Sequence, residues 1–331
     1  MLQTFLKWFR PQASSPAPLS APSSGDEALA YRLATRLLPE AIPQLKHAEV
    51  RPDTLMEPAL RAIGHMRGLV GSLGQPVLLN REAFFKEPRV NAMFTSAEQL
   101  QGFVREQAAL RAFFGEASRE TARILLTATP VARGQFGSAV QGEVIQRDVL
   151  QRGLTFESHR CPLVTQDGDA FTESVVSALM DLYAAKIGEM LLDLESRRAE
   201  CEHQAKSLGC KIKILEINTK SIGGMFSGKE DEAAKLASAR ELRASFEAEL
   251  DGLRSRLQDP VAYAREVAGA LANPGGILSG RHTSYRLDEY GIIHDLADAS
   301  VGNVVEFSEF TLETRTRVAL IADVPRAALE P

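Results

Sequence analysis

Two apolar stripes at heptad spacing constrain the fold of this chain more than any other feature of its sequence. In each stripe, apolar residues recur every three or four positions, a spacing that places them along one side of an α-helix. Each stripe therefore predicts a long helix whose apolar side needs a partner. The first stripe contains Val176, Met180, Tyr183, Ile187, Met190, Leu194 and Cys201, and the second contains Leu236, Ala239, Phe246, Leu250, Leu253 and Leu257.

The two predicted helices are expected to form an antiparallel hairpin over residues 171–258, because only a short glycine-containing loop separates them. A helix over residues 171–208 is roughly 57 Å long at 1.5 Å per residue, which is longer than a small domain is wide. The hairpin should therefore project from the rest of the protein. Arg197, Gln204 and Arg243 interrupt the stripes, and polar residues at such positions specify register and oligomeric state in coiled coils.

The beginning of the chain is predicted to be a short amphipathic segment followed by a tether. In residues 1–10, Lys7 and Arg10 lie opposite an apolar side that comprises Leu2, Phe5, Leu6 and Phe9, with Trp8 next to it. Residues 11–23 are mostly Pro, Ala and Ser, a composition that favours a flexible linker because it buries too little apolar surface to fold.

Residues 24–118 are predicted to form a helical region. Ser24 is followed three residues later by Glu27, and Ser96 by Gln99, which is the spacing of a capping box at a helix N-terminus. A further short helix should begin after the hairpin, where Asp259 precedes a proline.

Residues 119–331 are predicted to form an antiparallel sheet domain that contains the hairpin as an insertion. β-Branched residues are frequent there, and glycines at 134–137 and at Gly153 are expected to separate three strands before the hairpin. The expected fold class is therefore α+β, with an N-terminal helical region, an antiparallel sheet and a coiled-coil-like helical hairpin. The expected strands cover residues 124–133, 140–149, 154–161, 285–287, 292–294, 304–311 and 317–324.

Charge and cysteine content bound the classes of partner and compartment. The formal net charge is −5 with both signs interspersed, so nucleic acid is not expected as a partner. Three cysteines in a long chain indicate a reducing compartment, and no apolar run approaches the ~20 residues that span a bilayer. Lys7 and Arg10 interrupt the apolar run of a secretory signal. We expect a cytoplasmic protein, with peripheral membrane attachment as an alternative.

The segment from Gly223 through Gly228 to Lys229 fits the G-x-x-x-x-G-K pattern of a phosphate-binding loop, with residues 211–217 as a candidate preceding strand. However, Glu230 stands where such a loop needs a hydroxyl for Mg²⁺, and three consecutive acidic residues there would repel a triphosphate. Nucleotide binding by Gly223, Gly228 and Lys229 is therefore kept as an alternative function. A glycine-rich connection between packed helices is favoured.

No metal, cofactor or catalytic residue is predicted. Cys201, His203 and Cys210 lack the paired spacing of zinc sites and supply three ligands only. His159 and Cys161 share one face of an expected strand, where His159 is interpreted as a surface residue.

These observations indicate a non-enzymatic interaction or scaffold protein that self-associates or binds a protein partner through the hairpin. The residues expected to mediate this are those of the seam, namely Tyr183, Ile187, Met190, Leu194, Phe246, Leu250 and Leu253. The N-terminal residues Leu2, Phe5, Leu6, Trp8 and Phe9 would fill a partner groove or contact an anionic membrane surface weakly, which makes a peripheral membrane adaptor the other alternative.

Overall fold

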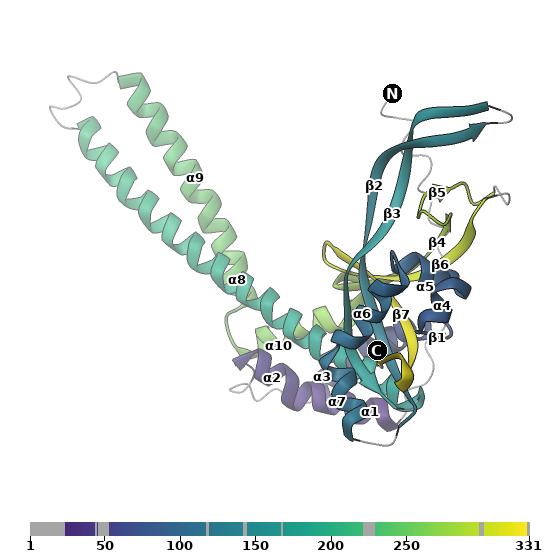
Figure 1. The fold of residues 1–331 in the computed structure, drawn as a ribbon. Helices are drawn as coiled ribbons and strands as arrows, with labels where there is room; N and C mark the ends of the chain where they lie inside the picture. The colour runs from purple at the N-terminus through teal and green to yellow at the C-terminus, as the bar shows by residue number, and fades with distance from the viewer. Residues whose placement is uncertain are drawn as a thin grey trace.

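The computed structural model describes residues 24–43, 45, 53–116, 119–141, 144–166, 168–220, 229–297 and 301–329. Its α+β fold confirms the predicted class: helices at the N-terminus, a mainly antiparallel sheet, and a long helical hairpin that projects from the rest, here called the body (Figure 1). The amphipathic segment 1–10, the linker 11–23 and residues 223–228 of the glycine-rich loop lie outside the described residues.

The predicted helical region consists of short helices, and the N-terminal cap expected at Ser96 is confirmed, whereas Ser24 is the first residue of its helix. Ser96 caps α6 by accepting a hydrogen bond from the backbone N–H of Gln99 at 3.2 Å. The Gln99 side chain accepts from the N–H of Thr95 at 2.7 Å, one residue earlier than in a standard capping box. The elements are α1 (Ser24–Arg32), the π-helical turn η2 (Leu33–Leu37), α2 (Leu38–Ala41), α3 (Asp53–Gly71), α4 (Arg81–Lys86), α5 (Pro88–Met93), α6 (Ala97–Glu106) and α7 (Ala108–Glu116).

Within the described residues, seven strands form one sheet in the order β3-β2-β7-β6-β4-β5, and short β1 pairs with β7 in parallel. All other pairs are antiparallel. A single bridge joins Gly153 to Ile292, so the two ends of the sheet meet there. The strands are β1 (Val77–Leu78), β2 (Thr121–Gln141), β3 (Val144–Thr165), β4 (Leu278–Leu287), β5 (Ile293–His294), β6 (Asn303–Leu312) and β7 (Arg315–Pro325).

The three strands expected before the hairpin are two longer ones, so that prediction was wrong. Gly134 and Gly153 lie inside β2 and β3, each opposite an arginine, and the expected strand 140–149 spans the turn between the two. Glycine tolerates extended backbone as well as turns, so its presence alone did not mark a chain reversal. β2 and β3 continue as a pair beyond the part of β2 that is hydrogen-bonded to β7 (Figure 1).

Helices cover both faces of the sheet, and each layer has its own core. Successive residues of β7 alternate between the two: Ala319 belongs to the first core and Leu320 to the second. The first core packs α1–α3, the start of α8 and α10 (Pro260–Ala272) against one face. The second core packs α4–α7 against the other. As predicted, Asp259 caps α10, by accepting from the N–H of Ala262 at 2.8 Å.

The hairpin consists of α8 (Gly168–Lys220), which has 53 residues, and the antiparallel α9 (Lys229–Arg256). α8 is continuous through Gly209, and residues 211–217, considered as a strand before a phosphate-binding loop, are helical. Extending a formed helix costs far less than starting a strand, and Ile212 is buried on the hairpin. The strand that a phosphate-binding loop requires is therefore absent from this part of the described chain. The described residues also include the 3-10 turns η5 (Pro274–Gly276) and η6 (Arg326–Leu329).

Candidate functional site

The part of the hairpin that leaves the body, residues 192–220 of α8 together with α9, is here called the stalk. The predicted seam residues divide between the body and the stalk. Tyr183 and Ile187 are buried in the first core, and Met190 packs against it. Leu194 lies at the junction and contacts both groups. Phe246, Leu250 and Leu253 pack around the buried Cys201 inside the stalk.

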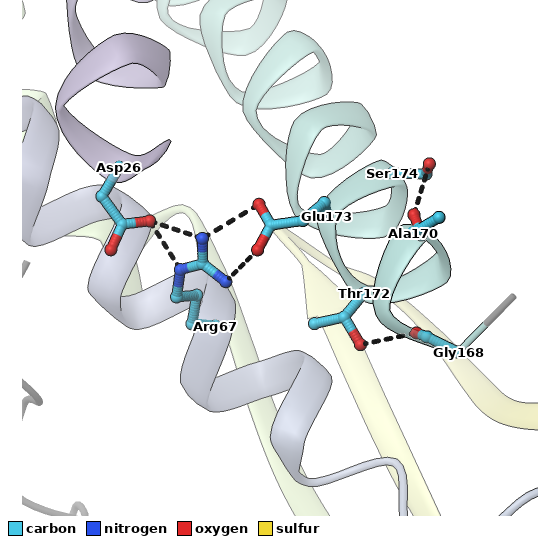
Figure 2. Close-up of polar contacts among 7 residues, drawn as sticks. All are labelled: Asp26, Arg67, Gly168, Ala170, Thr172, Glu173 and Ser174. Carbon is cyan, nitrogen blue, oxygen red and sulfur yellow. Dashed lines mark hydrogen bonds and ion pairs between the residues drawn. The ribbon is translucent and has the colours of Figure 1, made fainter. Parts of the chain in front are cut away.

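An arginine of α3 fixes the beginning of α8 to the body (Figure 2). The Nε of Arg67 donates to Asp26 Oδ1 at 2.6 Å, and its two terminal nitrogens donate to the carboxylate oxygens of Glu173 at 2.7 and 2.9 Å. The hydrogen bond to Glu173 is the main cause of a raised pKa of Arg67. Three helices, α1, α3 and α8, are thereby joined.

Further contacts hold the hairpin where it leaves the body. The Tyr183 hydroxyl donates to the carbonyl of Ala270 in α10 at 2.6 Å. The Tyr263 hydroxyl, whose pKa burial and the hydrogen bond to Glu195 raise to about 12, donates to that carboxylate. Both contacts join α10 to α8 near the exit point, which fixes the direction of the stalk relative to the body.

Inside the stalk, polar residues at the seam connect the two helices. Arg197 of α8 donates to both carboxylate oxygens of Glu249 of α9 at 2.6 and 2.8 Å, and its guanidinium carbon lies 6.0 Å from the centre of the Phe246 ring. Such a bidentate pair fixes the relative position of the helices along their axes. The seam arginine predicted to interrupt the apolar stripe therefore sets the register.

The stalk has a thin core of its own. Cys201, Leu250 and Leu253 are buried together, with Leu194 and Phe246 packed against them. Several large apolar residues remain exposed: the exposed fractions are 57% for Leu192, 58% for Ile214, 65% for Ile217 and 48% for Leu242. Two helices alone do not cover the apolar surface that this segment carries.

A groove between α8 and α9 carries charges of both signs that neutralise one another. Lys206 pairs with Glu202 at 2.8 Å and Arg243 with Glu247 at 2.8 Å. Such a lining does not select a ligand of one charge. The groove is lined by Glu202, Ala205, Lys206, Arg243, Glu247, Leu250, Asp251 and Arg254.

The interpretation of His159 as a surface residue was wrong. Its ring stacks on Phe94 with centroids 4.6 Å apart, its Nε2 lies 2.7 Å from the carbonyl oxygen of Met93, and burial lowers its pKa. The cause is a bulge at Ser158, whose φ of 54° and register shift reverse the alternation of faces along β3. Cys161 is half-buried, and burial raises its thiol pKa to about 11, which keeps it protonated.

The residues considered for zinc lie on different sides of α8. Cys201 is buried in the stalk core, whereas His203 and Cys210 are exposed. Among the residues that the structure describes, no group of three His, Cys, Asp or Glu side chains could hold a metal ion. Over the same residues, every helix is too short or too polar to cross a lipid bilayer.

The exposed apolar residues of the stalk were missed by the sequence analysis. Leu192, Ile214 and Ile217 follow helical spacing on the side of α8 opposite the seam, and this second spacing was the available signal.

No protein-family model matches this chain, and no curated protein or solved structure matches it significantly. The proposal for its function therefore rests on the residues of the stalk.

Proposed function

We propose that the protein is a non-enzymatic scaffold protein that self-associates through its stalk. One observation supports this proposal: the stalk has a small internal core, yet it leaves several large apolar side chains exposed. An exposed apolar patch on a long, projecting element is typical of a surface that a protein partner covers.

The contacts at the base of the stalk favour such binding. Covering a large aliphatic side chain such as Ile214 or Ile217 contributes about 1.5–3 kcal/mol each. Association must offset the entropy lost when two molecules and their side chains become ordered. Because Arg67, Tyr183 and Tyr263 already hold the direction of α8, little further ordering of the backbone is required. A preformed surface therefore retains more of the energy that its contacts provide.

The experiment compares the full chain with a variant in which a short glycine-rich linker replaces residues 199–248. Arg197 and Glu249 are in contact, so the ends to be joined lie side by side. The removed residues contribute nothing to the two body cores, so the variant should keep the circular dichroism signal of a folded sheet domain. In light scattering over a series of concentrations, the full chain should exceed the monomer mass and the variant should not. A full chain that is monomeric at every concentration would refute the proposal.

A further inference from the structure

Seven exposed residues on the outer side of α8 form a row, here called the outer stripe, whose spacing reads the same in both directions. Successive members are separated by four, three, four, four, three and four positions, so at 3.6 residues per turn they share one face of the helix. This face lies opposite the one that buries Cys201. The outer stripe comprises Leu192, Ser196, Ala199, His203, Ser207, Cys210 and Ile214.

Charges beside the outer stripe change sign halfway along it. On the half near the body, Asp193 and Glu200 are exposed, and on the half near the tip, Lys211 and Lys213 are exposed. Two residues of opposite charge are engaged on the inner side instead: Arg197 in the half near the body binds Glu249 of α9, and Glu216 in the half near the tip is bound by Arg240 of α9. The outer face is therefore acidic toward the body and basic toward the tip.

We propose that two copies of the chain pack stalk against stalk in antiparallel orientation, about a two-fold axis at His203. This inference rests on the proposed self-association and specifies its geometry. The axis places Ile214 against Leu192 of the partner subunit and Lys211 beside Asp193 of the partner subunit, because Lys211 and Asp193 lie on the same flank of the outer stripe. The palindromic spacing lets every member of the outer stripe meet another member, as a self-complementary two-fold interface requires.

The residues between the apolar ends of the outer stripe suit a close approach of two helices. Ser196, Ala199 and Ser207 are small, and the distance between packed helix axes depends on the side chains at the contact. A parallel arrangement is disfavoured, because it would place Lys213 beside Lys211 of the partner subunit and the acidic halves side by side.

The contact is short, so the dimer should be in reversible equilibrium with the monomer. From residue 192 to residue 214 the outer stripe extends roughly 33 Å at 1.5 Å per residue. Stable interfaces commonly bury about 1,200–2,000 Å² in total, and a single pair of helices over this length lies toward the lower end of that range.

Charge reversal tests the geometry. Lys211→Asp and Asp193→Lys should each raise the dimer dissociation constant about tenfold or more, because each creates two like-charge contacts per dimer. The double variant should restore much of the affinity in sedimentation equilibrium. Restoration within one chain is impossible, because positions 193 and 211 are roughly 27 Å apart along α8. Glu241→Lys, an exposed change on α9, is the matched control and should leave the dissociation constant unchanged.

Disulfide formation provides the second measurement. Ser196→Cys should form an intermolecular disulfide with native Cys210 on mild oxidation, and Ser196→Cys combined with Cys210→Ser should not. A parallel dimer would instead link Cys210 to Cys210 of the partner subunit in the unaltered chain. If the chain dimerises but shows neither charge rescue nor the 196–210 disulfide, the antiparallel geometry is wrong and the proposed self-association still holds. If the chain is monomeric at all concentrations, the geometry and the self-association are both wrong.

Discussion

At the scale of single residues, Arg67 connects parts of the protein that are far apart in sequence. Its two partners come from α1 and α8, at 41 and 106 residues' separation. Asp26 is 7% exposed and Arg67 compensates the charge of its carboxylate, whereas Glu173 retains contact with solvent. Arg67 falls within the predicted helical region 24–118, but neither partner could be inferred from the sequence, because its local pattern does not encode contacts between distant residues.

Replacing Arg67 by Leu should destabilise the protein by about 1–3 kcal/mol, because the buried Asp26 carboxylate loses its charged partner. Arg61→Leu on the same helix is the matched control, because Arg61 pairs with exposed Glu57 and such pairs contribute about 0–1 kcal/mol. Urea unfolding followed by circular dichroism measures both. Equal effects of the two changes would contradict a structural role for the Arg67 contacts.

His159 should make stability depend on pH. Burial lowers its folded pKa below the ordinary value of about 6.5, so as pH falls below that value the unfolded chain takes up a proton first. The contribution of neutral His159 to stability is therefore fully present above the pKa that His159 has in the unfolded chain. It decreases as pH falls toward the pKa that His159 has in the folded protein.

The decrease in melting temperature between pH 7 and pH 5 should be smaller in His159→Phe than in the unaltered chain. Phenylalanine can keep the stacking on Phe94 and carries no titratable group. An identical decrease in both proteins would show that His159 is not responsible.

At the scale of elements, the local period of the sequence decided what could be predicted. The hairpin was foreseen because a 4-3 repeat is a local signal, and the caps at Ser96 and Asp259 were foreseen for the same reason. The extents of β2 and β3 were not, because glycine is compatible with both a strand and a turn. The bulge at Ser158 cannot be recognised in the alternation of apolar and polar residues. His159 was therefore predicted to lie on the wrong face of β3.

Two glycines of α8 should respond oppositely to substitution by alanine. At Gly209, a Cβ atom would lie 3.4 Å from the guanidinium of Arg243, a flexible neighbour, so Gly209→Ala should stabilise the helix by up to about 1 kcal/mol. At Gly188, the Cβ would lie 3.0 Å from the backbone oxygen of Ala41, which cannot move freely. Gly188→Ala should therefore destabilise by about 1–3 kcal/mol.

Amide hydrogen exchange along α8, together with urea unfolding, separates the two effects. Protection of the stalk should increase in Gly209→Ala, whereas global stability should fall in Gly188→Ala. Destabilisation by both would contradict the different surroundings that the structure gives these positions.

At the scale of the whole molecule, the heptad stripe of α8 packs against two different sets of helices. Its beginning is covered by α3 and α10 in the body, and its later part by α9. An apolar stripe in the sequence indicates that one face of a helix must be covered, but it does not indicate which element covers that face. Residues 171–258 could therefore be predicted as a hairpin, whereas the placement of Tyr183 and Ile187 in the body core could not.

α8 runs without interruption from the first core to the end of its described residues. A rod of this kind has no joint at which bending could be absorbed, so a pull applied at its tip acts with leverage on its fixed end. Mechanical load on the tip would therefore reach the Tyr263–Glu195 and Tyr183–Ala270 contacts at the exit point first, and the Asp26–Arg67–Glu173 contact at the far end of the same helix after them.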